Sequence, residues 1–183
     1  PLFRFLLWKH RLSPDTPREA NQKYLDDLLG ELRASRHVRQ AVLLGMDGVY
    51  DGAGRLLQDQ TDFLIGNDYV LKAARAHPNE LLAGVSINPQ RSDAVEEVHR
   101  VAEAGAVLVN VLPNAQQFNP ADHKYIPFYR ALAERKLPFL SHVGYEFSLI
   151  GKDQSVGDRD RLHTALDEGV TVIAAGVLVV FAA

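Results

Sequence analysis

The sequence predicts an α/β fold, a TIM-barrel-like (β/α)8 parallel barrel of which this chain forms a part. Short apolar, β-branched runs alternate with longer stretches of helical period between Ala41 and Ala175, as in chains of βα units. The apolar runs are nearly continuous, which is typical of parallel strands that are covered on both faces. The later units recur at about thirty residues, the size of one βα unit.

The predicted strands, in chain order, are Ala41–Met46, Leu82–Ile87, Ala106–Leu112, Phe139–Val143 and Val170–Ala175. The right-handed crossover rule predicts that they lie parallel and adjacent in this order, with helices on the outer face. A complete barrel needs about 250 residues and the chain has 183, so we expect residues 1–183 to form a single, partial barrel domain. An open doubly wound sheet is the alternative. A nucleotide-binding version of it lacks support, because no phosphate-binding glycine motif follows a strand.

Capping residues, glycine and proline predict where the helices between these strands begin and end. Asn67 and Ser92 are placed to cap two helices, and Pro127 fits the first turn of a third. Gly105 and Gly169 supply the left-handed residues that end helices. A further helix is expected before the first strand, with an apolar stripe made by Tyr24, Leu25, Leu28, Leu29 and Leu32.

Composition and charge limit the classes of function. Hydrophobic residues make up 46% of the chain and charged residues 23%, which is usual for a soluble globular domain. The net charge is -3 and the Lys and Arg residues are scattered, so nucleic acid is not an expected partner. Because the chain has no cysteine, any metal must be held by His and carboxylate side chains. The absence of cysteine, and so of disulfides, also makes a cytoplasmic location the expected one.

Neither end of the chain predicts a membrane segment. Pro1–Trp8 is apolar but contains Arg4 and lacks a small-residue cleavage site, so we do not interpret it as a signal peptide. Thr171–Ala183 runs thirteen residues without a charge, fewer than the roughly 20 that span a bilayer, and a buried strand is the preferred interpretation. The expected partner is a small-molecule substrate, and association into a homo-oligomer is left open.

Polar residues follow the predicted strands at their C-terminal ends, where parallel α/β folds bind their ligands. They are Asp47 after the first strand, Asn88 after the second, Asn110 and Asn114 at the third, and His142, Tyr145 and Glu146 after the fourth. The carboxylates of this set, Asp47 and Glu146, are the candidates for proton transfer. Its amides and phenol are predicted to bind substrate, although Asp and Asn in such positions also close turns.

His142 is the only one of the seven histidines that ends a predicted strand. A neutral imidazole there can bind a borderline cation such as zinc, or it can be an ordinary polar residue. Because side chains alternate along a strand, His142 shares a face with Leu140, opposite Phe139. An imidazole against the outer helices would lack a polar partner, so we expect His142 to face the interior. There it would lie beside Asn110, Asn114 and Glu146.

The run from Asn67 to Phe147, with the phrases "NPQRSDAVEE", "VLPNAQQFNPAD" and "FLSHVGYE", resembles the metal-dependent amidohydrolases of the amidohydrolase-2 type. The similarity covers most of the chain, from about Leu12 to Ala175. The resemblance implies a distorted (β/α)8 barrel that binds one or two divalent metals, with His142 as the ligand after the fifth barrel strand. The five predicted strands would then be barrel strands two to six.

The chain departs from that family at several positions. Gly176 stands where the family has a His after the sixth strand, and Asn110 stands where many relatives have Lys. The family's H-x-H pair on the first strand and its aspartate after the eighth have no counterpart here. With His142 as the one ligand of the usual set, we expect the chain to bind metal weakly and to show little hydrolase activity.

Together these features predict a metal-dependent hydrolase that cleaves a C-N or C-O bond of a small carbonyl substrate. A divalent metal, expected to be zinc, would activate a water molecule as the nucleophile. Two alternatives stay open: a non-oxidative decarboxylase built on the same metal barrel, and a catalytically silent half-barrel scaffold. Metal retained after dialysis would separate the enzymes from the scaffold.

Overall fold

The computed structural model describes residues 17–146, 149 and 151–176. In this part of the chain the strands are β1 (Ala41–Leu44), β2 (Leu81–Ser86), β3 (Ala106–Val111), β4 (Phe139–His142) and β5 (Val172–Ala175). The α-helices are α2 (Pro17–Ala34), α3 (Asn67–Ala76), α4 (Ala94–Glu103), α5 (Pro113–Gln116), α6 (Ile126–Glu134) and α7 (His163–Asp167). Short 3-10 helices lie at Gln58–Gln60, His123–Tyr125, Gln154–Gly157 and Arg159–Leu162. None of the described helices has the length and apolar character needed to cross a membrane.

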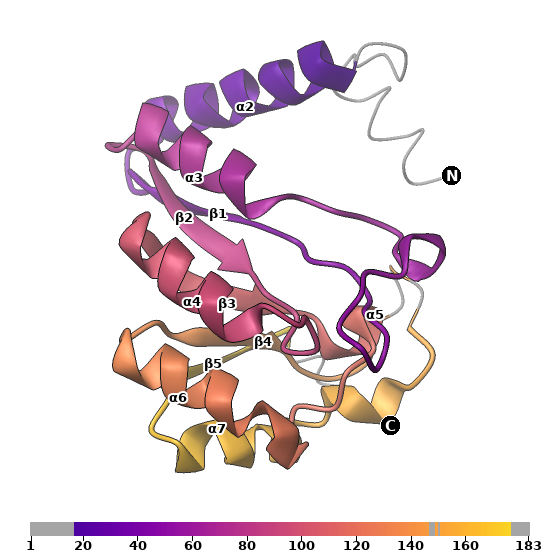
Figure 1. Cartoon of the computed structure of the whole chain (residues 1–183). Helices are drawn as coiled ribbons and strands as arrows, with labels where there is room; N and C mark the ends of the chain where they lie inside the picture. The colour runs from indigo at the N-terminus through magenta and orange to yellow at the C-terminus, as the bar shows by residue number, and fades with distance from the viewer. Residues whose placement is uncertain (1–16, 147–148, 150, 177–183) are drawn as a thin grey trace, which may run out of the picture.

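The strands form one sheet in the order β1-β2-β3-β4-β5, and each neighbouring pair is parallel. Figure 1 shows α3, α4, α6 and α7 side by side along one face of this sheet. The predicted strand order, the parallel direction and the outer helical layer are therefore confirmed. Parallel strands joined by right-handed helical crossovers give this arrangement, and the architecture is that of a TIM-barrel-like α/β fold.

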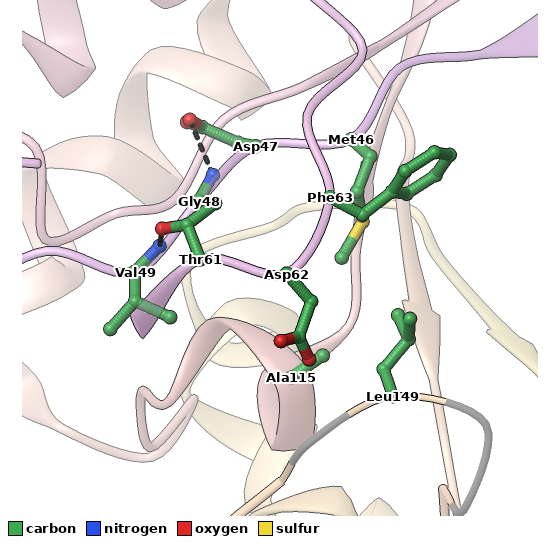
Figure 2. A pocket seen from close by; sticks show the side chains of 9 residues that line it. All are labelled: Met46, Asp47, Gly48, Val49, Thr61, Asp62, Phe63, Ala115 and Leu149. Carbon is green, nitrogen blue, oxygen red and sulfur yellow. Dashed lines mark hydrogen bonds between the residues drawn. The ribbon is translucent and has the colours of Figure 1, made fainter. Parts of the chain in front are cut away.

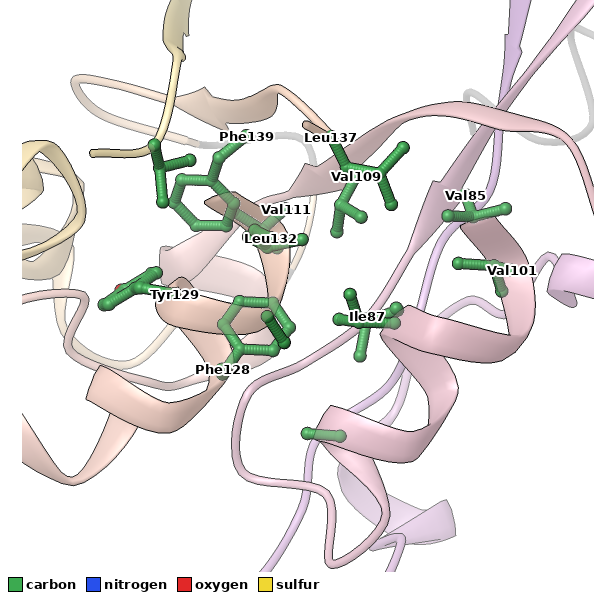
Figure 3. Close-up of a cluster of buried hydrophobic side chains, with 14 of the residues drawn as sticks. Val85, Ile87, Val101, Val109, Val111, Phe128, Tyr129, Leu132, Leu137 and Phe139 are labelled. Atoms are coloured by element: carbon green, nitrogen blue, oxygen red, sulfur yellow. The ribbon is translucent and has the colours of Figure 1, made fainter. Parts of the chain in front are cut away.

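The hydrophobic core lies between the sheet and the outer helices. Its centre is aromatic: Phe139 of β4 meets Phe128 and Tyr129 of α6 in edge-to-face contacts with ring centroids 6.2 and 5.6 Å apart. Valines from the neighbouring strands, among them Val85 and Val109, continue this layer (Figure 3). Phe139 thus fixes which face of β4 is turned toward the helices.

The opposite, inner face of the sheet is mainly apolar, with Asn110 and His142 among the polar residues near the C-terminal ends of its strands. A Cβ atom at Gly84 would lie 2.6 Å from Val42 Cγ1 and 2.7 Å from Leu44 Cδ2, so these side chains cover the glycine on that face. Val42 and Leu44 are each 38% exposed, and Ile173 is 40% exposed. Leu140 pairs with Ile173 and His142 with Ala175. Because side chains alternate along a strand and Phe139 faces the helices, Leu140 and His142 lie on this inner face.

Two predicted helix caps are wrong. Asn67 is the first residue of α3, not its cap, and its side chain leaves the helix: Oδ1 accepts from Ser86 N at 2.8 Å, and Nδ2 donates to Glu97 Oε1 at 2.8 Å. Helix α4 begins after Asp93 instead of Ser92, without a side-chain cap. At Asn67 a contact distant in sequence replaces the local capping bond that the residue type suggested. At the start of α4 the Asp93 carboxylate accepts from Arg91 Nε at 2.8 Å and caps no backbone N-H of the helix.

The Glu97 carboxylate is buried between Asn67 and Arg100. Arg100 Nε donates to Oε2 at 2.6 Å and Arg100 Nη2 to Oε1 at 2.8 Å. Burial by itself would raise the pKa of Glu97, but the bonds from Arg100 and Asn67 outweigh it and hold this pKa below the ordinary value of 4.5. Glu97 therefore stabilises the fold only while it is ionised.

This lowered pKa makes a pH-dependent stability expected. A carboxyl group with a lower pKa in the folded state stabilises above the unfolded-state pKa, and that stabilisation is lost as the pH falls through the folded-state pKa. Urea unfolding from neutral pH to about pH 3 should show a steeper acid loss for the native chain than for Glu97→Gln. The neighbouring exposed Glu96→Gln is the control and should follow the native curve. Superimposable curves for Glu97→Gln and the native chain would contradict the argument.

Candidate functional site

The Asp47 carboxylate is buried just beyond β1 and accepts hydrogen bonds on both oxygens. Oδ1 accepts from Gly48 N and from the Tyr50 hydroxyl, both at 2.8 Å. Oδ2 accepts from Asn88 N at 2.8 Å and from Arg91 Nη1 at 3.4 Å. Burial and the charge of Asp47 raise the pKa of Tyr50 well above its ordinary value, so this hydroxyl remains a donor. Asp47 joins the loops that follow β1 and β2.

Asn88 and Gln116 form a second link, and both side chains are completely buried. Asn88 Nδ2 donates to the carbonyl oxygens of Gly48 and Gln116, each at 2.9 Å. Gln116 Nε2 donates to the Asp47 carbonyl oxygen at 3.3 Å and to Ser86 Oγ at 3.2 Å. The predicted substrate contact of Asn88 stays a prediction. The bonds seen here use its amide to tie the loop after β1 to α5.

Asn114 lies in α5 and is also completely buried. Its Nδ2 donates to Gln154 Oε1 at 2.9 Å and to the Gly144 carbonyl oxygen at 3.4 Å. Its Oδ1 has no hydrogen-bond partner and lies against Gly157, where an added Cβ would come within 2.8 Å of it. These contacts attach the loop after β4 to α5, and a substrate contact of Asn114 stays a prediction as well.

The two remaining predicted substrate residues differ in exposure. Asn110 is buried near the end of β3, and its Nδ2 donates to the Gly45 carbonyl oxygen at 3.2 Å. It pairs with Leu140, so it shares the inner face with His142. Tyr145, in the loop after β4, is 60% exposed, and its ring is accessible to a ligand arriving from solvent.

His142 and Glu146 are brought together after β4. His142 Nε2 and Glu146 Oε2 are 3.8 Å apart, with side chains 19% and 13% exposed. The Nε2 atom itself is shielded from solvent and has no hydrogen-bond partner. His142 therefore lies on the predicted inner face and beside Glu146. Its expected proximity to Asn110 and Asn114 stays a prediction, and Asp47 belongs to the separate network described above.

A small pocket lies beside the loop that follows β1 (Figure 2). It is lined by Met46, Asp47, Gly48, Val49, Thr61, Asp62, Phe63, Ala115 and Leu149. Its volume is about 10 Å³, roughly room for one water molecule. In Figure 2 the Asp47 carboxylate points away from Phe63 and Leu149. This pocket is too small for an organic substrate, so the inner face around His142 is the better candidate site.

The residues around His142 fit a divalent cation as a partial ligand set. The shielded, unpartnered Nε2 is a nitrogen donor, and Glu146 supplies an oxygen donor 3.8 Å away. Two donors bound to one ion at about 2.1 Å are separated by about 3–3.5 Å, so a shift of a few tenths of an ångström is sufficient. No group of three His, Cys, Asp or Glu residues suited to a metal occurs among the described residues.

Comparison with known proteins identifies the family. The sequence model of the amidohydrolase family matches residues 17–178 of this chain. The chain belongs to the amidohydrolase family. The resemblance drawn from the phrases after the second, third and fourth strands is therefore confirmed. A search of curated proteins finds no match for this amidohydrolase chain.

This amidohydrolase chain is similar to parts of several solved structures. A protein from Pseudomonas putida assigned as a 2-pyrone-4,6-dicarboxylic acid hydrolase aligns with a TM-score of 0.54 and 17% identity, over 82% of this chain and 45% of that one. A protein from Staphylococcus aureus assigned as an amidohydrolase aligns with a TM-score of 0.50 and 17% identity, over 74% and 46% of the two chains. A 5-carboxyvanillate decarboxylase from Sphingomonas paucimobilis aligns with a TM-score of 0.49 and 16% identity, over 78% and 44%. The chain thus spans less than half the length of these proteins.

Sequence reasoning missed three polar side chains of this amidohydrolase site: Arg91, Gln116 and Gln154. Arg91 follows Asn88 by three positions, and Gln116 follows Asn114 by two. Each lies in a phrase that carried the family resemblance or in the loop beyond it. A longer window after each strand would have included the first two. Gln154 is remote in sequence from the strand end that it contacts, so no local signal pointed to it.

Proposed function

We propose that this chain is part of a metal-dependent hydrolase that cleaves a C-N or C-O bond of a small carbonyl substrate. The observation that carries the proposal is the unpartnered, shielded Nε2 of His142 on the inner face of an amidohydrolase sheet. Its position at the C-terminal end of β4 is where barrels of this type build their active sites. The hydrolase named for the Pseudomonas putida protein supports the same reaction class.

In this proposal His142 would hold the divalent ion through Nε2. The ion, with zinc as the proposed species, would supply a Lewis acid for the substrate carbonyl and a more acidic water molecule. Tyr145, which is accessible, would contact the substrate, and Asn110 would present its carbonyl group to the same inner face. Of the two carboxylates predicted for proton transfer, Glu146 faces the imidazole, while both oxygens of Asp47 are bound by protein donors.

The completely buried amides of Asn88 and Asn114 would serve this site by holding its loops. A direct bond from either amide nitrogen to substrate requires the loss of contacts with the backbone, and an unpaired buried carbonyl costs about 1–3 kcal/mol. A cytoplasmic location, favoured by the absence of cysteine, completes the proposal.

A hydrolysis assay at high protein concentration tests this function. The substrates are lactones, esters and amides of small carboxylic acids, each with zinc or manganese added and with a chelator. We expect slow hydrolysis that depends on the added metal and falls at least about tenfold in His142→Gln. His77→Gln, which alters a histidine at the opposite ends of the strands, is the control and should keep the native rate.

Equal rates in His142→Gln and the native chain, or no metal-dependent hydrolysis of any substrate, would overturn the proposal. Release of carbon dioxide from an aromatic carboxylate, without hydrolysis, would favour the decarboxylase alternative in its place.

A further inference from the structure

The imidazole of His142 is held between Gly176 and Glu146. A Cβ atom added to Gly176 would lie 2.5 Å from both Cε1 and Nδ1 of the ring, so the ring fills the space that any side chain at this position would need. Gly176 also has φ +82°, a conformation that glycine adopts with least strain. The backbone of Gly176 therefore blocks one edge of the ring.

The other edge of the ring presents Nε2 toward the Glu146 carboxylate at 3.8 Å. An unprotonated Nε2 and a carboxylate oxygen are both acceptors, so a stable approach requires a proton or a cation between them. The separation is longer than a hydrogen bond, but it is close to the spacing of two donors on one metal ion. Coordination by both atoms would satisfy the lone pair that has no hydrogen-bond partner in the structure.

Gln154 fixes the backbone from which Glu146 extends. Gln154 Oε1 accepts from Glu146 N at 2.9 Å, and Gln154 Nε2 donates to the Glu146 carbonyl oxygen at 2.9 Å. The same Oε1 accepts from Asn114 Nδ2 at 2.9 Å. The buried amide of α5 thus acts through Gln154 to fix the backbone of Glu146, and a fixed backbone reduces the entropy that is lost when the side chain binds an ion.

We propose that Glu146 and His142 together chelate one divalent cation, and that Gly176 is a positioning residue for the imidazole. This inference rests on the proposed function, because it names the second protein ligand of the same ion. It assigns Glu146 to ion binding instead of the proton transfer expected from the sequence. Two protein donors leave the rest of the coordination sphere to water or substrate, so the affinity should be modest.

Calorimetric titration of the full chain with zinc chloride tests the chelate, and cobalt(II) absorption reports the nitrogen and oxygen ligands independently of activity. We expect Glu146→Gln, which keeps the shape of the side chain, to weaken zinc binding at least about tenfold and to change the cobalt spectrum. His142→Gln should have an effect at least as large. Circular dichroism and thermal unfolding of each variant establish that it is folded.

Gly176→Ala tests the positioning role against a matched control. Gly169 has φ +79° and no atom within 4 Å of an added Cβ, so Gly169→Ala carries similar backbone strain without the contact on His142. We expect Gly176→Ala to weaken zinc binding about tenfold or more and Gly169→Ala to leave it unchanged. Equal zinc affinities of the two alanine variants would overturn the role of Gly176.

The titrations separate failure of this inference from failure of the proposed function. If His142→Gln loses zinc and Glu146→Gln binds it as the native chain does, Glu146 is not a ligand, and the proposed function stands. If His142→Gln binds zinc as tightly as the native chain, both the chelate and the metal-dependent function are overturned.

Discussion

Replacing Phe139 by alanine is expected to lower the free energy of unfolding by about 3–5 kcal/mol. The Phe139 ring is completely buried and packs edge-to-face on Phe128 and Tyr129. Its removal forfeits the transfer free energy of the ring and leaves a cavity between β4 and α6 that the surrounding side chains fill only in part. Urea unfolding followed by circular dichroism measures the loss.

Leu140→Ala is the matched control, because Leu140 is the next residue of the same strand and points to the half-covered inner face. We expect a clearly smaller loss, since less apolar area leaves contact with the protein. If the two variants lose equal stability, the assignment of the faces of β4 is wrong. The inner-face position of His142 would then be wrong as well, because both follow from the same alternation.

Asp47→Asn is expected to cost about 3 kcal/mol or more of folding free energy. Four donors converge on the native carboxylate, two on each oxygen. In asparagine an NH2 group replaces one of the two carboxylate oxygens. In one orientation this NH2 group faces the backbone N-H of Gly48 and in the other that of Asn88, so two donors face each other in either case. The Arg91 guanidinium also loses the charge of its buried partner. The loops after β1 and β2 should consequently open.

Hydrogen exchange and thermal unfolding measure this change. Asp93→Asn is the control: it removes the other carboxylate bonded to Arg91, at 2.8 Å, but Asp93 is exposed, and such pairs are worth about 1 kcal/mol or less. If Asp47 served only in proton transfer, its replacement would leave the stability of the fold unchanged. In that case Asp47→Asn would keep native stability and native exchange in both loops.

The strands and their order followed from local pattern alone. Continuous β-branched runs between amphipathic segments at βα spacing leave few topologies, and the crossover rule reduces them to the observed order. The face of His142 was predictable for the same reason: alternation fixes it once Phe139 is assigned to the core. The phrases after β2, β3 and β4 were sufficient for the family.

The tertiary structure decided which polar residues face each other. Asp47, Asn88 and Asn114 follow strands as a site residue would, yet their partners are backbone and side-chain groups brought near by the packing of loops. The spacing of Asn114 and Gln154, or of Asn67 and Glu97, in the sequence carries no signal of these contacts. The same holds for Gly176, whose need for glycine depends on the ring of His142. Local sequence determines secondary structure and the direction of each side chain. The partner of a buried polar group depends on long-range geometry, because a buried donor must bond to whichever acceptor the fold places within reach.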